Sequence, residues 1–252
     1  MITQRDLKYY SSLLIKKFRS DEEKFLVEGL KIVEEGLASD FSCEAIFATP
    51  AFIDSFPDLI DKIKNKTSRL IQLKSAEFQR ISDTRSPQGI AAVFNKSVPK
   101  KKIDERKDKF LVFLDNISDP GNLGTILRTC DWFDIKAILI SNQSVEYLNP
   151  KVIRASMGSV FHLDIYEDID FEELKKLKKN GYEIFCTDLQ GNDYKKFKSQ
   201  NNSIITFSNE SLGPSEFLKE LATDYITIPK KGKAESLNVS SAAAIILSEF
   251  TN

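Results

Sequence analysis

The stretch FLVFLDNISDPGNLGTILRTCDW (residues 110–132) carries the clearest fold signal in the chain. It opens with an unbroken apolar run, which is typical of a strand buried on both faces of a parallel sheet. Asp119 can then cap a helix, and Pro120 suits the first helical position, where a missing N–H leaves nothing unpaired. Further apolar residues recur at helical spacing: Leu123, Ile126, Leu127 and Cys130. The stretch predicts a buried strand that leads directly into a helix.

Two features of this helix do not follow from its apolar stripe. Gly124 costs roughly 1 kcal/mol relative to alanine in a helix interior, so we expect something to approach the backbone closely there. Asn122, Arg128 and Thr129 would lie at or near the polar side. Taken alone, these polar residues favour a solvated surface helix, and Gly124 shifts the balance modestly toward a functional one.

Strands and helices continue to alternate on the C-terminal side. We expect strands over residues 136–141, 182–189, 203–207 and 225–229, and helices over residues 171–181, shortly after Pro214 and over about 238–250. Strands that alternate with helices indicate a mostly parallel sheet covered on both faces.

The N-terminal side has a similar but shorter alternation. Helical patterns cover residues 8–18, 25–37 and about 53–64, and another begins at Ser75, while β-rich segments cover residues 43–49, 69–73 and 89–94. This order predicts a small α/β layer domain.

The charge distribution divides the chain. The net charge is −1, which argues against nucleic-acid binding by bulk charge alone. Residues 96–109, however, hold 7 basic and 3 acidic side chains, whereas residues 1–95 hold 14 of each. We therefore predict a domain over residues 1–95, a basic linker over residues 96–109 and a second domain over residues 110–252. From charge alone, a solvated linker is favoured over one that tracks a phosphate backbone.

Composition places the protein among ordinary globular chains. Of 252 residues, 41% are apolar, and no apolar run approaches the roughly 20 residues of a membrane helix. The N-terminus lacks the apolar core of a signal peptide. Cys43, Cys130 and Cys186 are isolated thiols, which predicts reduced core residues in a cytoplasmic protein rather than a disulfide framework or a zinc site. His162 lies in an apolar context, where we expect a packed or edge-strand residue.

Three loops that follow predicted strands are candidates for chemistry, because ligands of parallel sheets collect beyond the carboxyl ends of the strands. They are NISDPGNLGTILRT, FSNESLGPS and IPKKGKAESLNVSSAAA. Each has an ordinary interpretation: Glu210 can be a solvated loop carboxylate, and the small residues 240–244 fit a tight helix–helix contact as well as a ligand. The chain has no glycine-rich dinucleotide or phosphate loop and no metal-ligand spacing.

Together these segments resemble the three motifs of the SpoU family of RNA ribose 2′-O-methyltransferases, within the SPOUT superfamily. The motifs appear as SDPGNLGTILRT, FSNESLGPS and IPKKGKAESLNVSSAAAIIL, in the expected order, and NPKVIRASMGSVFHL between the first two also looks like the family. The first 95 residues are similar to the family's N-terminal substrate-binding domain, a small ribosomal-protein-like RNA binder.

The resemblance implies an α/β protein with a C-terminal SPOUT methyltransferase domain, in which a mostly parallel sheet contains a deep trefoil knot. It implies S-adenosylmethionine as cofactor, no metal, a homodimer formed through the C-terminal domain, and RNA as substrate, with ribosomal RNA favoured over transfer RNA. No membrane partner is expected.

The resemblance also assigns site residues. The positions that match the family's catalytic site are Arg128, Asn122, Glu210, Ser236 and Asn238. The positions that match its cofactor contacts are Ser208, Ile228 and Leu237. Gly124 would leave room for this site. Arg128 would hydrogen-bond the ribose hydroxyl or accept its proton; orientation and charge stabilisation come first, because the high pKa of arginine makes it an awkward base.

Three positions depart from the family pattern. Ser208 and Ser211 replace the glycines of the family's Gly-x-Glu-Gly, which would weaken cofactor binding if the backbone required a glycine-only conformation. Serine keeps the N–H, so we expect binding to survive. Lys230 replaces a common methionine and is interpreted as an RNA-phosphate contact. The alternative supported by the serines is a non-catalytic RNA-binding protein that keeps the fold, such as a ribosome-assembly factor.

Overall fold

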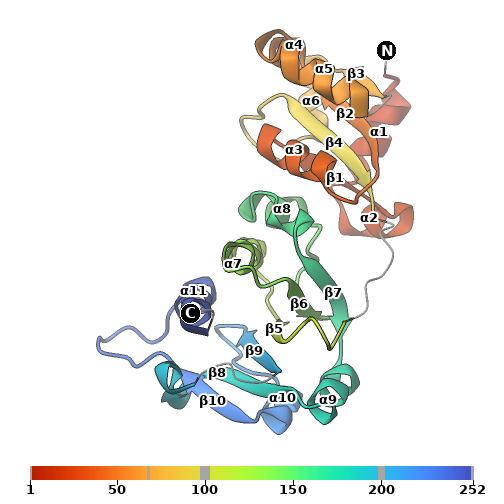
Figure 1. Cartoon of the computed structure of the whole chain (residues 1–252). Helices are drawn as coiled ribbons and strands as arrows, with labels where there is room; N and C mark the ends of the chain where they lie inside the picture. Colours follow the sequence, from red (N-terminus) through yellow and green to blue (C-terminus); the bar gives the residue numbers. More distant parts are fainter. Residues whose placement is uncertain (1, 67–68, 97–102, 198–201, 251–252) are drawn as a thin grey trace. The chain divides into compact units, whose positions relative to one another are not determined.

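The computed structural model describes residues 2–66, 69–96, 103–197 and 202–250 (Figure 1). The chain divides into two compact units. Unit 1 consists of Met1–Lys100 together with Tyr147–Phe161, and unit 2 consists of Lys101–Glu146 together with His162–Asn252. No local pattern indicates that residues 147–161 group with unit 1. The predicted basic linker falls partly on residues 97–102, which lie outside the described residues.

Unit 1 is built on a four-stranded sheet with the order β1-β4-β2-β3. Its strands are β1 (Lys24–Glu28), β2 (Cys43–Ala48), β3 (Leu70–Gln72) and β4 (Ile90–Asn95). Its helices are α1 (Gln4–Ser12), α2 (Lys16–Glu22), α3 (Leu30–Ala38), α4 (Pro50–Ser55), α5 (Pro57–Lys66), α6 (Ser75–Ile81) and α8 (Pro150–Ala155), with the short 3₁₀ helix η1 (Ser159–Phe161). The strand β2 pairs parallel with β3, and β4 pairs antiparallel with β1 and β2.

Three helices expected in unit 1 were wrong in extent. Residues 25–37 contain β1 and α3, because pairing with β4 draws the apolar run into the sheet and Gly29, at φ +103°, turns the chain. Residues 8–18 are divided between α1 and α2, which are separated near Leu13. The helix expected near residues 53–64 is divided between α4 and α5, because Phe56 precedes Pro57 and leaves the helical conformation.

Unit 2 confirms the mostly parallel sheet. All five strand pairs are parallel, in the order β10-β8-β9-β5-β6-β7. The strands are β5 (Phe110–Asp115), β6 (Ala137–Ser141), β7 (Asp164–Ile169), β8 (Glu183–Asp193), β9 (Ser203–Ser208) and β10 (Asp224–Thr227). The helices are α7 (Pro120–Trp132), α9 (Phe171–Lys179), α10 (Glu216–Leu221) and α11 (Val239–Phe250), with the 3₁₀ helix η2 (Tyr194–Lys196).

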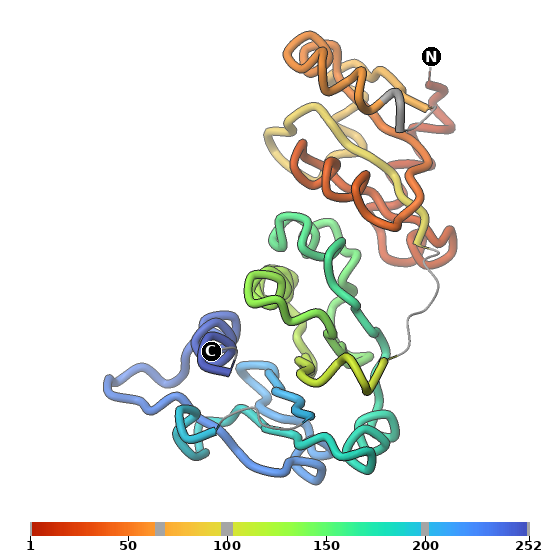
Figure 2. The backbone as a smooth tube through the Cα atoms, in the orientation of Figure 1, coloured from red at the N-terminus to blue at the C-terminus, as the bar shows by residue number. Residues whose placement is uncertain are grey.

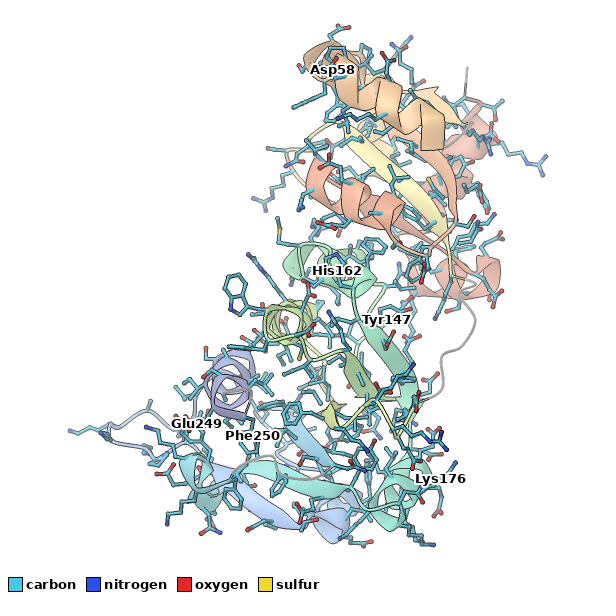
Figure 3. The ribbon with its side chains drawn as sticks, viewed as in Figure 1. Asp58, Tyr147, His162, Lys176, Glu249 and Phe250 are labelled. Atoms are coloured by element: carbon cyan, nitrogen blue, oxygen red, sulfur yellow. The ribbon has the colours of Figure 1, made fainter. Side chains whose placement is uncertain are left out.

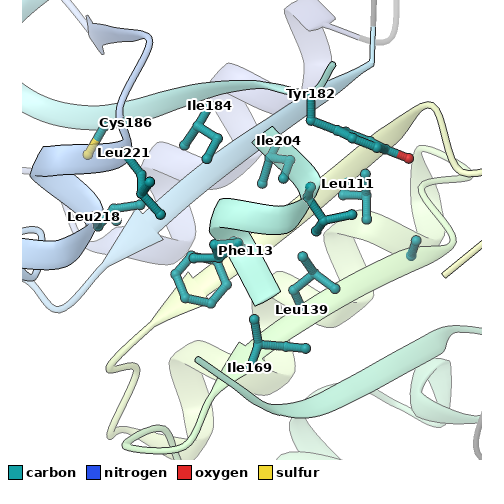
Figure 4. Close-up of a cluster of buried hydrophobic side chains, with 13 residues drawn as sticks. Leu111, Phe113, Leu139, Ile169, Tyr182, Ile184, Cys186, Ile204, Leu218 and Leu221 are labelled. Carbon is teal, nitrogen blue, oxygen red and sulfur yellow. The ribbon is translucent and has the colours of Figure 1, made fainter. Parts of the chain in front are cut away.

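Helices pack on this sheet through apolar side chains. A buried cluster joins Leu111 and Phe113 of β5 to Leu218 of α10 (Figure 4). Leu174 of α9 belongs to the same cluster. The helix α11 packs against α7 and also contacts β9. The strand β7 was not expected, because its residues are mostly half-buried and polar rather than an apolar run. The trefoil knot that the resemblance implies stays a prediction.

The three cysteines and His162 can be compared with what the sequence predicted for them. Cys130 and Cys186 are buried and unpaired, as expected of core thiols, whereas Cys43 is only partly buried. Burial raises the pKa of both buried thiols, that of Cys186 to about 11. The expectation for His162 was wrong: this residue (labelled in Figure 3) is exposed in a turn before β7, with its Nδ1 2.8 Å from Oδ2 of Asp131. None of the described helices is long and apolar enough to cross a membrane.

Candidate active site

The sheet of unit 2 has a point at which its connections diverge. After β5 the chain continues to β6 on one side, and after β9 it continues to β10 on the other. Because β5 and β9 are adjacent and parallel, their carboxyl ends lie together, with Asp115 opposite Ser208. Ligands of open parallel sheets bind at such a point. All three loops singled out in the sequence leave strand ends at this edge of the sheet.

The first loop ends in the helix start that the sequence predicted. Asp119 has an extended backbone and its Oδ1 accepts the N–H of Asn122 at 2.8 Å, with Pro120 in the first turn. Capping of this kind stabilises a helix by about 1 kcal/mol. It also fixes Asn122 in the first turn of α7, so that its side chain reaches toward the second loop.

Three predicted catalytic residues meet in one hydrogen-bond cluster. Asn122 donates through Nδ2 to Glu210 Oε1 at 3.2 Å, and Asn238 donates through Nδ2 to Asn122 Oδ1 at 2.9 Å. Glu210 Oε1 also accepts the N–H of Val239 at 2.8 Å, at the start of α11. A carboxylate is favourable at a helix N-terminus, so this contact ties the second loop to the third. We call Asn122, Glu210 and Asn238 the polar cluster.

A cavity of about 530 Å³ opens beside the polar cluster. Glu210, Ser236 and all three predicted cofactor positions, Ser208, Ile228 and Leu237, line it. Residues 228–238 lie outside any helix or strand, and of their backbone groups the Asn238 carbonyl oxygen accepts the N–H of Ala242 in the first turn of α11 at 3.0 Å. Figure 2 shows this segment as an extended excursion between β10 and α11. Apolar side chains from β9, β10 and α11 form much of the remaining wall: Phe207, Ile226 and Ile246.

The two serines that depart from the family pattern cause no backbone strain. Neither Ser208 nor Ser211 is among the described non-glycine residues with positive φ. The Ser208 hydroxyl donates to Asp115 Oδ2 at 3.4 Å, and the same oxygen accepts the N–H of Ser215 at 2.8 Å. The buried carboxylate of Asp115, which is 2% exposed, therefore holds both ends of the loop 208–215.

Two predicted catalytic residues lie outside the polar cluster. The side chain of Arg128 is exposed on α7 and makes no hydrogen bond or ion pair with another described residue. Ser236 is exposed at the cavity, and its side chain makes no hydrogen bond to the polar cluster. Lys230 also lines the cavity and is exposed, so its ammonium group is accessible to a ligand.

The small residues of α7 and α11 have two structural explanations. Gly124 is buried in α7, which packs against α11, and Ala243 of α11 is fully buried. On the same helix, Val239 and Ala242 line the cavity. The sequence allowed either a helix–helix contact or a ligand as the reason for these small residues. In the structure the helix–helix contact and the cavity are both present, on neighbouring residues of α11.

Reasoning from the sequence missed some parts of the site. Asp188 and Leu189 line the cavity where β8 bulges away from β10, at a register shift between Tyr225 and Ile226. No local pattern indicates a bulge of this kind. Asn209 was also missed, although an asparagine beside a turn is a typical side-chain acceptor for backbone N–H groups.

Comparisons with known proteins confirm the resemblance for both parts of the chain. The model of the SpoU rRNA Methylase family matches residues 109–248. The model of the MRM3-like substrate binding domain matches residues 4–92.

Individual relatives span nearly the whole chain. The chain is 30% identical to the 23S rRNA (guanosine(2553)-2′-O)-methyltransferase RlmP of Bacillus subtilis, over 96% of this chain and 94% of that protein. A TrmH-family putative RNA methyltransferase of Porphyromonas gingivalis superposes with a TM-score of 0.87 at 30% identity, covering 99% of this chain and 98% of that one. An AdoMet-bound rRNA methyltransferase of Sinorhizobium meliloti superposes with a TM-score of 0.88 at 26% identity, covering 99% and 95%.

Proposed function

This chain belongs to the SpoU rRNA Methylase family, and from that membership we propose that it transfers a methyl group from S-adenosylmethionine to a ribose 2′-hydroxyl of RNA. The observation that carries the proposal is the polar cluster at the rim of the cavity, where Asn122, Glu210 and Asn238 come together from three loops.

The residues of the cavity fit the cofactor. Its volume lies within the roughly 300–1,000 Å³ of small-molecule sites. Ser208, Ile228 and Leu237 would hold the cofactor, with apolar side chains against its flat base and main-chain groups of residues 228–238 toward its polar edge. When bound, the cofactor supplies a methyl group on a sulfonium, a strong electrophile.

The protein's own residues would prepare the nucleophile. A ribose hydroxyl is weakly nucleophilic until its proton is moved or its oxygen is oriented. Arg128 is exposed and uncommitted among the described residues, so its guanidinium is available to hydrogen-bond the 2′-oxygen and stabilise negative charge. Asn122 and Asn238 would hold the RNA or Arg128 in place: Glu210 orients the amide of Asn122, and Asn122 in turn orients the amide of Asn238. Ser236 would bind RNA from the cavity rim.

We propose ribosomal RNA as the substrate. The relative from Bacillus subtilis carries a ribosomal RNA substrate in its name, and the substrate-binding model matches unit 1 of this chain. Lys230 and Lys231 are exposed at the cavity, where they would contact RNA phosphates close to the reacting ribose. The basic linker predicted over residues 96–109 would add positive charge for RNA binding.

We also propose a homodimer through unit 2. Trp132 at the end of α7 is 84% exposed, and Ile245 of α11 is 37% exposed, on two helices that pack against each other. A partner subunit that covers these two helices would bury both side chains. The variant Trp132→Glu should shift the protein from dimer to monomer in size-exclusion chromatography with light scattering, and an unchanged mass would exclude Trp132 from an interface.

The non-catalytic alternative has lost its support, because Ser208 and Ser211 adopt backbone conformations open to any residue. Calorimetric titration with S-adenosylmethionine tests the choice. Micromolar binding at one site per chain is expected, and titration with S-adenosylhomocysteine provides the product control. If the folded protein binds neither compound, the methyltransferase proposal fails and the RNA-binding scaffold takes its place.

A further inference from the structure

Asn209 lies between Ser208 and Glu210 and uses both ends of its side-chain amide. Its Oδ1 accepts the N–H groups of Ser211 at 2.9 Å and Leu212 at 3.2 Å. Its Nδ2 donates to the Asn116 carbonyl oxygen at 3.2 Å and to Ser118 Oγ at 3.3 Å. The oxygen end therefore contacts the loop that contains Asn209, whereas the nitrogen end contacts the loop between β5 and α7.

The oxygen end shapes one wall of the cavity. Ser211 and Leu212 both line the cavity, and their N–H groups converge on Asn209 Oδ1. The main-chain carbonyl of Asn209 accepts the N–H of Gly213 at 2.9 Å, which closes the same turn. Side-chain acceptors of this type fix a turn that would otherwise sample several conformations.

The nitrogen end fixes the segment that carries Asn122. Asn116 has a left-handed backbone at φ +59°, and its N–H donates to Ser141 Oγ at 2.8 Å. Ser118 directly precedes Asp119, the residue that caps α7 and holds Asn122. Asn209 and Glu210 are consecutive, so the two loops are joined twice: by Asn209 to residues 116 and 118, and by Glu210 to Asn122.

We infer that Asn209 is a positioning residue with two separable roles. Its Oδ1 maintains the shape of the cofactor wall, and its Nδ2 sets the distance between the β9 loop and the start of α7, so that Glu210 and Asn122 meet beside the cavity. The inference rests on the proposed function for its consequence in catalysis. The hydrogen bonds themselves do not depend on it.

Two substitutions separate the two ends of the amide. Asn209→Asp keeps an acceptor for Ser211 and Leu212 but removes the donor, and it places a carboxylate against the Asn116 carbonyl oxygen. Asn209→Ala removes both functions. Asn142→Asp is the matched control, because Asn142 is an exposed turn residue of unit 2 and undergoes the same change of charge.

Three measurements are made on each variant of the full chain. Methyl transfer is followed with labelled S-adenosylmethionine on total RNA from cells that lack the gene. Cofactor affinity is measured by calorimetry, and amide hydrogen exchange is measured over residues 208–214. We expect Asn209→Asp to lower kcat about tenfold, the scale of one or two lost hydrogen bonds, while cofactor affinity changes less than about threefold. We expect Asn209→Ala to lower kcat and also weaken cofactor binding about tenfold, with faster exchange at Ser211 and Leu212.

The outcomes distinguish this inference from the proposed function. Wild-type kcat in Asn209→Asp would overturn the role of Nδ2, and so would equal losses of kcat and affinity in both variants. Unchanged exchange at Ser211 and Leu212 in Asn209→Ala would overturn the role of Oδ1. If the wild-type protein neither binds the cofactor nor methylates RNA, the proposed function fails, while the exchange data still decide whether Oδ1 holds the turn.

Discussion

Two glutamates, one in each unit, bind a neighbouring loop in different ways. Glu28 at the end of β1 is 6% exposed, and both of its carboxylate oxygens accept hydrogen bonds. The donors are Ser82 Oγ at 2.8 Å, the Asp83 N–H at 3.3 Å and Thr84 Oγ1 at 2.6 Å. Glu210 is exposed at the cavity, and both of its hydrogen bonds to described residues go to Oε1.

The difference separates a structural carboxylate from one available for function. A buried carboxylate must have its hydrogen-bonding capacity satisfied by the fold, because an unsatisfied charge away from water is costly. The carboxylate of Glu210 can leave Oε2 open because solvent or a ligand reaches it. Residues that the fold leaves incompletely bonded beside a cavity, such as Glu210, are therefore the better candidates for chemistry.

The largest effect is expected at Arg128. The variant Arg128→Ala should lower kcat for methyl transfer by about 100-fold, the scale of losing one preorganised donor in a reaction centre. The affinity for S-adenosylmethionine should stay within about threefold, because Arg128 does not line the cavity. The charge-preserving variant Arg128→Lys serves as control and should recover part of the loss. Equal kcat in wild type and Arg128→Ala would remove Arg128 from the reaction.

The next effect concerns stability and is expected at Glu28. Replacing Glu28 by Ala leaves three donors without their acceptor, so the free energy of unfolding should fall by about 2 kcal/mol. Urea denaturation measures this change, and the variant should still bind the cofactor normally when folded. A change in the free energy of unfolding below about 0.5 kcal/mol would show that water replaces the carboxylate. Glu28 and Glu210 would then not differ in the way described.

A smaller effect is expected at Glu210, and it concerns cofactor affinity rather than stability. The variant Glu210→Ala should weaken cofactor binding about tenfold in calorimetry, because the loop 208–215 loses its link to Val239 and Asn122. Its free energy of unfolding should change by less than about 1 kcal/mol, since the side chain is exposed. Glu210→Gln keeps an acceptor and should be affected less. A large loss of stability with unchanged affinity would assign Glu210 the structural role of Glu28.

The smallest effect near neutral pH is expected at Cys186. Burial raises the pKa of this thiol to about 11, so it stays protonated in the folded protein between pH 7 and pH 9. A raised folded pKa contributes stability below the unfolded value near 9, and this contribution is lost as the pH rises toward 11. The stability profiles of wild type and Cys186→Ala should therefore run parallel up to about pH 8 and converge above it. Divergence below pH 8 would contradict this assignment.

Local signals in the sequence predicted most of unit 2. The apolar run of β5 and the Asp119–Pro120 cap act within a few residues, so they determine a strand and a helix start without tertiary information. The expected helix over residues 25–37 was wrong because its first part is determined by a long-range contact. Pairing of Lys24 with Asn95 joins positions far apart in the chain, and this pairing overrides local periodicity.

The site was predictable only in part. The family resemblance singled out Asn122, Glu210 and Asn238, and the structure brings these three together although 88 and 116 positions separate Asn122 from the other two. No spacing rule reaches across such separations. The bonds of Asn209 were not predictable, because they depend on the register that places Asp115 opposite Ser208.

The central claim is methyl transfer to a ribose of RNA, and one measurement tests it most directly. The purified protein is incubated with labelled S-adenosylmethionine and total RNA from cells that lack its gene, and the RNA is analysed for 2′-O-methylated nucleosides. We predict label at a single position in ribosomal RNA, present with wild type and reduced about 100-fold with Arg128→Ala. Absence of label from the RNA, by a folded protein that binds the cofactor, would contradict the account.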